Sequence, residues 1–243
     1  MMLRIDLHRD FGYTFRRLRR SPGFLLLAAG TMALGIGAST AEFAIMDALL
    51  LRPMSGISQP RALLAIREYD EHEHTFTSFS YPNYRHYRDH TRSFTGLAAW
   101  DVVEAYINSP KPQQIVAALV SANYFDLLGV RLSAGRSFRP DEEGEPGKHP
   151  VVVVSHAFWT SRLNADPGVI GKPITIDRTR FTVIGIAPRR FRGVELFDQI
   201  DVWTPVSMFA TFQPGLIQTN LLADPSQGHF VVIGKLAPGF RLT

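Results

Sequence analysis

Residues 23–41 read GFLLLAAGTMALGIGASTA, a run of nineteen residues without a charged side chain. At about 1.5 Å per residue, a helix of this length is roughly 28 Å long, close to the ~30 Å hydrocarbon core of a bilayer. The apolar pattern continues to Leu51 and is interrupted only by Glu42 and Asp47. The sequence therefore predicts a transmembrane helix over residues 23–51.

The positive charge of the chain lies in front of this helix. Residues 1–22 contain six arginines and two aspartates, which account for the whole formal net charge of +4, whereas the remaining residues carry 20 basic and 20 acidic side chains. Because basic residues gather on the cytoplasmic side of membrane helices, we expect a cytoplasmic N-terminus and a body outside the cytoplasm beyond about residue 52. The residues of this cytoplasmic anchor are Arg16, Arg17, Arg19 and Arg20. A nucleic-acid-binding protein would carry its basic excess on the folded domain, so nucleic acid is not an expected partner.

Two periodic patterns extend this interpretation. A stripe of apolar residues at steps of three and four predicts an amphipathic helix in the cytoplasmic interface over residues 1–22, and consists of Leu3, Leu7, Phe11, Phe15 and Leu18. A stripe of small residues recurs every fourth position within the span, at Ala29, Ala33, Gly37 and Ala41. Small side chains let another helix approach closely, although they are also common in membrane helices in general. If this stripe is a packing surface, its partner is a second copy of the chain or further membrane helices.

A cleaved signal peptide is the alternative reading of the N-terminus. It requires an apolar stretch of about 7–15 residues and a small-residue cleavage site. The apolar stretch here is longer, yet GAST at residues 37–40 resembles a processing site. Cleavage near Ala41 would release the body as a secreted protein, for example a hydrolase.

The residues after Pro53 predict an α+β domain built from short strands, short helices and Pro/Gly turns. Helices are expected at Tyr81–His90 with Ser80 as N-cap, at 123–128 before Gly129, and at 155–163 with Ser155 as N-cap. Strands are expected at 63–67, 97–106, 114–120, 150–154, 201–206 and 230–236, with a hairpin of 174–177 and 181–186 around residues 178–180. The last ten residues, GKLAPGFRLT at 234–243, read as a strand and a turn at which a domain seldom ends, so we expect a longer domain cut short.

Seven blocks of the sequence occur in the order of a known family. They are FRRLRRSPGF at 15–24, ALGIGASTAEFAIMDALLLRP at 33–53, SYPNYRHYRDHTRSFTGLAAW at 80–100, VSANYFDLLGVRLSAGRSF at 120–138, HPVVVVSHAFWTSRL at 149–163, DPGVIGKPITIDRTRFTVIGIAPRRFRG at 166–193 and DVWTPVSM at 201–208. Together they resemble the first membrane helix and the periplasmic core domain of MacB/FtsX-type ABC transporter permeases. The resemblance covers nearly the whole chain.

The resemblance implies a bacterial inner-membrane permease with residues 52–243 as its periplasmic core domain. In such a system a separate cytoplasmic ATPase drives the membrane helices, and the periplasmic domain transmits the movement. The family pattern continues with three further membrane helices, so the chain is expected to be truncated before them. Two other outcomes stay open, a stand-alone membrane-anchored binding module and an inactive truncated permease.

The sequence offers little catalytic or metal chemistry. No phosphate loop of the form GxxxxGK[ST] and no cysteine occur, so ATP hydrolysis, a thiolate metal site and a Cys nucleophile are not expected. His86 and His90 share a predicted helix face, with His72 and His74 upstream, which makes them candidates for a zinc site. Beyond Asp89, however, no acidic residue has the spacing of a ligand, and no cofactor is expected. Three candidates are weaker. A Ser155-His156 nucleophile is better explained by Ser155 as a helix cap, and a calcium loop at 141–145 is better explained as a solvated turn. Arg189, Arg190 and Arg192 are candidates for contact with an anionic headgroup or a partner. The tyrosines at positions 81, 84 and 87 are expected to pack in the core.

Overall fold

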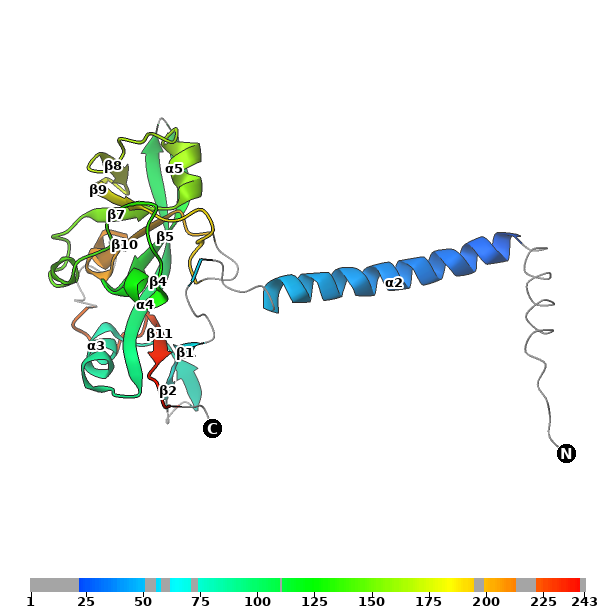
Figure 1. Ribbon diagram of the computed structural model, residues 1–243, viewed down its shortest axis with the longest axis horizontal. Helices are drawn as coiled ribbons and strands as arrows, with labels where there is room; N and C mark the ends of the chain where they lie inside the picture. The colour runs from blue at the N-terminus through cyan, green and yellow to red at the C-terminus, as the bar shows by residue number, and fades with distance from the viewer. Residues whose placement is uncertain are drawn as a thin grey trace. The chain divides into compact units, whose positions relative to one another are not determined.

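The computed structural model describes residues 22–50, 56–57, 62–70, 74–109, 111–194, 199–212 and 222–240 (Figure 1). The chain divides into two compact units at the Arg52–Pro53 junction. The predicted amphipathic helix, together with Arg16, Arg17, Arg19 and Arg20, lies outside the described residues.

The first unit contributes helix α2, Pro22–Leu50. Among the described residues, one helix is long and apolar enough to cross a membrane, and it is the part of α2 from Pro22 to Ala44. Its large apolar side chains are exposed, with 78% of the surface of Leu34 and 73% of that of Leu26 accessible. The helix begins at Pro22, which suits a first turn because its missing N–H would have no partner there.

The second unit is built on a mixed sheet that has nine strands in the described part of the chain. Its order is β1(Leu63–Ile66), β11(Val231–Leu236), β4(Phe94–Ser109), β5(Lys111–Val120), β10(Val202–Pro205), β7(Val151–Val154), β9(Thr179–Ile186) and β6(Ala134–Gly135). Strand β8(Pro173–Ile176) pairs with both β9 and β4, so the path of strands from β4 through β5, β10, β7, β9 and β8 returns to β4. A separate hairpin joins β2(Glu68–Asp70) and β3(Thr75–Thr77).

The longest strands form the antiparallel pair β4 and β5, and Figure 1 shows β4 running along most of the domain. Both strands extend beyond their predicted limits, since β4 was expected over 97–106 and β5 over 114–120. The hairpin of β8 and β9 turns at Asp177 and Arg178, both with positive φ, so Arg180 lies within β9 rather than in the turn. Positive φ at both central residues is typical of the two-residue turns that match the twist of the strands.

The predicted helices and their caps are confirmed. In α3(Tyr81–His90) the Ser80 hydroxyl accepts a hydrogen bond from the Asn83 N–H at 3.2 Å, and in α5(His156–Arg162) the Ser155 hydroxyl accepts one from Phe158 at 3.0 Å. Helix α4(Tyr124–Leu128) ends at Gly129, whose φ of 65° is left-handed. Short helical turns η2(Pro140–Glu143), η3(Val206–Met208) and α6(Phe209–Phe212) complete the described elements and were not predicted.

The core consists of two clusters of buried side chains, one on each face of the sheet. Successive residues of β4 alternate between them, Leu97 and Ala99 belonging to one cluster and Ala98 and Trp100 to the other, as the two-residue period of a strand requires. Side chains of α3, α5 and α6 join the first cluster, and side chains of α4 join the second. The α+β fold class predicted from the sequence is therefore confirmed.

Candidate functional site

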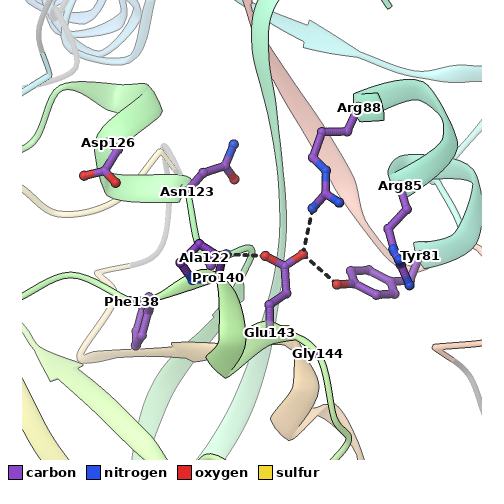
Figure 2. Close-up of a pocket in the computed structure, with 10 residues that line it drawn as sticks. All are labelled: Tyr81, Arg85, Arg88, Ala122, Asn123, Asp126, Phe138, Pro140, Glu143 and Gly144. Carbon is purple, nitrogen blue, oxygen red and sulfur yellow. Dashed lines mark hydrogen bonds and ion pairs between the residues drawn. The ribbon is translucent and has the colours of Figure 1, made fainter. Parts of the chain in front are cut away.

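The α+β domain has a pocket of about 490 Å³ between α3, the start of α4 and η2. Figure 2 shows its lining, which consists of Tyr81, Arg85, Arg88, Ala122, Asn123, Asp126, Phe138, Pro140, Glu143 and Gly144. The three walls come from three separate parts of the sequence, and the fold brings them together where β5 ends at Val120.

Glu143 holds these walls together. Its Oε1 accepts hydrogen bonds from the Tyr81 hydroxyl at 2.6 Å and from Arg88 Nη1 at 3.3 Å, and its Oε2 accepts one from the backbone N–H of Ala122 at 2.7 Å (Figure 2). Only 7% of the surface of Glu143 is exposed. A buried carboxylate is costly unless it is paired and hydrogen-bonded, and here three donors satisfy it. The contacts join η2 to α3 and to the segment after β5.

The tyrosines beside Glu143 remain protonated donors. The pKa of Tyr81 is raised far above its ordinary value, mainly by burial and secondly by the negative charge of Glu143. Burial and the same charge raise the pKa of Tyr84 to about 12, and its hydroxyl donates to the carbonyl of Leu97 at 3.2 Å. The guanidinium of Arg88 lies 5.5 Å from the centroid of the Tyr84 ring and also pairs with Asp89 at 2.9 Å. The wall formed by α3 is therefore fixed by several polar contacts.

The neighbouring Glu142 is buried as well, in a second ion pair. Arg136 donates to its two carboxylate oxygens at 2.6 and 3.0 Å, and the backbone N–H of Arg139 donates at 2.8 Å. The Glu142 carbonyl accepts a hydrogen bond from the buried hydroxyl of Ser207. The interpretation of residues 141–145 as a solvated turn is thus wrong for Glu142 and Glu143, because both carboxylates are buried with partners, Glu142 through nearby donors and Glu143 through distant ones.

The other residues that the sequence singled out lie elsewhere. His86 and His90 do share a face of α3, with ring centroids 4.4 Å apart, but the described residues contain no group of three or more potential metal ligands, and His72 lies outside them. Ser155 caps α5, and in the described part of the chain no hydrogen bond joins it to the His156 ring. Arg189 and Arg192 line a smaller pocket of about 340 Å³ beside α5. Tyr81 and Tyr84 are buried as expected.

Tyr87 departs from its prediction. It is 49% exposed, although its ring meets that of Phe79 edge-to-face with centroids 5.6 Å apart. Since α3 has one face on β4, a side chain three residues beyond Tyr84 lies at the margin of that contact.

The small-residue stripe lies on α2. Ala29, Ala33, Gly37 and Ala41 are all exposed, and their four-residue spacing puts them along one side of the helix. Their role in helix packing stays a prediction.

Sequence reasoning missed the Glu143 pocket. Its donors lie 62, 55 and 21 residues from Glu143 in the chain, so no local spacing marks them. The only local sign is the Pro140-Asp-Glu-Glu143 run, whose proline opens a helical turn that carries Glu142 and Glu143 inward.

The fold of this chain is similar to that of solved structures of transporter domains. The chain resembles the periplasmic region of MacB from Actinobacillus actinomycetemcomitans, with a TM-score of 0.53 and 13% identity over 76% of this chain and 78% of that one. It also resembles the extracellular domain of the noncanonic ABC-type transporter YknZ from Gram-positive bacteria, with a TM-score of 0.51 and 13% identity over 73% and 83% of the two chains. At these identities the likeness shows the fold alone. No curated protein sequence matches the chain.

The family assignment rests on the sequence. The family model of the MacB-like periplasmic core domain matches residues 25–241, a single stretch that begins within α2 and continues through the α+β domain. The chain therefore belongs to the MacB-like periplasmic core domain family of ABC transporter permeases.

Proposed function

We propose that the chain is a non-catalytic permease component of an ABC-type export or mechanotransmission system. Helix α2 anchors it in the inner membrane with the N-terminus in the cytoplasm, and the α+β domain works in the periplasm. A separate cytoplasmic ATPase supplies the energy, and the domain passes on the resulting movement. The observation that carries this proposal is the family match, which includes helix and domain in one continuous stretch.

The orientation is tested by labelling single cysteines, since the chain has none of its own. Ser161→Cys places a thiol on the exposed surface of α5, and Thr14→Cys places one in the N-terminal segment. In spheroplasts, a membrane-impermeant maleimide is expected to label the first variant directly and the second only after lysis. The reverse pattern overturns the orientation, and a mature chain that lacks residue 14 indicates cleavage.

The cytoplasmic anchor is tested in the same assay. Replacing Arg16, Arg17, Arg19 and Arg20 together by Gln removes most of the basic excess before the helix. Because that excess biases orientation, a fraction of Thr14→Cys in this background is expected to be labelled before lysis. Unchanged labelling would show that these arginines do not set the topology.

The ATPase is tested by affinity purification of the full chain in a mild detergent. An ATP-binding-cassette subunit is expected to co-purify and to be identified by mass spectrometry. Recovery of a correctly oriented chain with no such subunit favours the alternative, a membrane-anchored periplasmic binding module.

Helix packing in the membrane is tested along the small-residue stripe. Ala33→Leu and Gly37→Leu are expected to weaken the association of α2 with its partner helix, because bulky side chains keep the backbones apart. Gly35→Leu is the matched control, since position 35 lies about 200° around the helix from position 37. Cross-linking yields in membranes measure the effect, and an equal loss in all three variants contradicts a specific packing face.

A further inference from the structure

The pocket beside Glu143 has walls of opposite charge. Figure 2 shows Arg85 and Arg88 entering from α3 on one side and Asp126 from α4 on the other, with Glu143 between them. A ligand that spans such a pocket meets a cation at one end and an anion at the other. This arrangement favours a dipolar ligand over a purely anionic or purely cationic one.

Two of the charged groups have unused hydrogen-bonding capacity. Within the described residues, no hydrogen bond or ion pair engages the guanidinium of Arg85 or the carboxylate of Asp126. Arg85 does attract Asp89 electrostatically, but Asp89 already accepts a hydrogen bond from Arg88. Arg85 and Asp126 are thus the groups best able to pair with a ligand.

The site is preorganised. Glu143 is buried and satisfied by Tyr81, Arg88 and Ala122, so it shapes the pocket without needing a ligand to neutralise it. Asn123 is likewise fixed, because its amide donates to the Leu97 carbonyl at 2.8 Å and its oxygen accepts from the Ser121 hydroxyl. Glu143 and Asn123 therefore already hold their positions when a ligand enters, and the entropic cost of ordering falls on the exposed side chains of Arg85 and Asp126.

The remaining lining sets the size and the apolar part of the ligand. Pro140 is exposed and gives the pocket an apolar surface beside the charged walls, to which the buried Phe138, 4% exposed, adds little. A volume of about 490 Å³ lies within the usual range for small-molecule sites. It accommodates a molecule of two or three amino-acid residues.

We propose that this pocket binds a short peptide with free termini. The peptide carboxylate pairs with Arg85, the ammonium group pairs with Asp126, and a small apolar side chain contacts Pro140. The proposal concerns a binding site of the domain itself and does not depend on the ATPase or on the orientation of α2.

The test is isothermal titration calorimetry on the full chain in detergent micelles with three probes. L-alanyl-L-alanine carries both charges, its N-acetyl derivative lacks the ammonium group, and its C-terminal amide lacks the carboxylate. We expect saturable binding of the free dipeptide and about tenfold weaker binding of each blocked form, since each lacks one charge-assisted hydrogen bond.

Single substitutions test which residue pairs with the carboxylate of the dipeptide and which with its ammonium group. Arg85→Gln is expected to weaken dialanine binding about tenfold and to remove the preference for the free carboxylate, and Asp126→Asn to remove the preference for the free ammonium group. Arg92→Gln and Asp141→Asn, exposed positions outside the pocket lining, are the matched controls and should bind as wild type. An unchanged denaturation midpoint shows that each variant is folded. No saturable binding of dialanine, or equal binding of all three probes, overturns the proposal.

Discussion

Leu34 in α2 leaves 78% of its surface exposed, whereas Leu119 in β5 leaves none. The same contrast holds for phenylalanine, since Phe24 in α2 is 63% exposed and Phe125 in α4 is fully buried. The α+β domain thus covers its apolar side chains with its own elements, while the described side chains of α2 have no such cover. This difference is the one expected between a domain that folds in water and a helix that is proposed to lie in lipid.

The largest effect is expected from Phe125→Ala. The Phe125 ring lies within 6 Å of the rings of Tyr124, Phe138, Phe191 and Trp203, so its removal leaves a cavity in the second cluster. We expect the domain to lose about 3–5 kcal/mol of unfolding free energy. All three tryptophans, Trp100, Trp159 and Trp203, belong to the domain, so their fluorescence during urea denaturation reports on it alone.

Phe24→Ala is the control for this variant, because it removes the same side chain from an exposed position in α2. It should leave the fluorescence transition of the domain unchanged. Equal destabilisation by the two variants would mean that the stability of the domain depends on α2, contrary to the division of the chain into two units.

A somewhat smaller effect is expected from Leu34→Arg. Position 34 lies near the middle of the apolar part of α2, Pro22–Ala44, where an arginine costs about 2.5–3.5 kcal/mol on insertion scales. The fraction of the chain that resists alkaline carbonate extraction is expected to fall, while the denaturation midpoint of the domain stays constant. Leu34→Ala should remain in the membrane, and full retention of the arginine variant would contradict the role of α2 as a membrane span.

The Glu142→Gln variant tests whether the buried carboxylate of Glu142 stabilises the domain. Burial alone would raise the pKa of Glu142, but hydrogen bonds from Arg136 and from the Arg139 N–H together lower it below its ordinary value of 4.5. The stability that this carboxylate contributes is therefore present above about pH 4.5 and is lost as the pH falls through the lower folded pKa. We expect the variant to be about 2 kcal/mol less stable at pH 7.

The pH dependence separates this charge effect from a packing effect. The difference between wild type and Glu142→Gln should shrink as urea denaturation is repeated at pH values below about 4. Glu145→Gln, which alters an exposed pair with Lys148, should change stability little at any pH. A constant difference at all pH values would show that packing, rather than ionisation, explains the loss.

The features that could be predicted from the sequence are the local ones. The serine caps of α3 and α5 and the glycine at the end of α4 depend on residues within about one helical turn, through a hydroxyl that accepts an N–H and a left-handed φ. The apolar run of α2 depends on one continuous hydrophobic stretch of lipid length and on no contact with distant residues.

The pocket could not be predicted, because its chemistry depends on long-range contacts. Glu143 looks like a solvated acid when only its neighbours are read, and it is buried because Tyr81, 62 residues away, donates to it. The same holds for the length of β4, whose partners include β11, far along the sequence. Periodicity shows which face of a strand is apolar, but the pairing that extends the strand is set by the whole sheet.

The smallest effect, and one of opposite sign, is expected at Asp101. Asp101 lies on the same face of β4 as Ala99 and Val103, which belong to the first cluster. Burial raises the pKa of Asp101 to about 6, although a hydrogen bond of 2.8 Å from the Val102 N–H to its Oδ1 acts in the opposite direction. A folded pKa above the ordinary value of about 3.9 means that the folded state holds the proton more tightly, so stability falls as the pH rises from about 4 to about 6. Asp101→Asn keeps the oxygen acceptor and removes the charge. It should therefore raise the unfolding free energy by about 1 kcal/mol at pH 7 and leave it unchanged near pH 4, whereas the exposed Asp141→Asn should show no such dependence. A variant less stable than wild type at pH 7 would mean that the ionised Asp101 has a stabilising partner in the sheet.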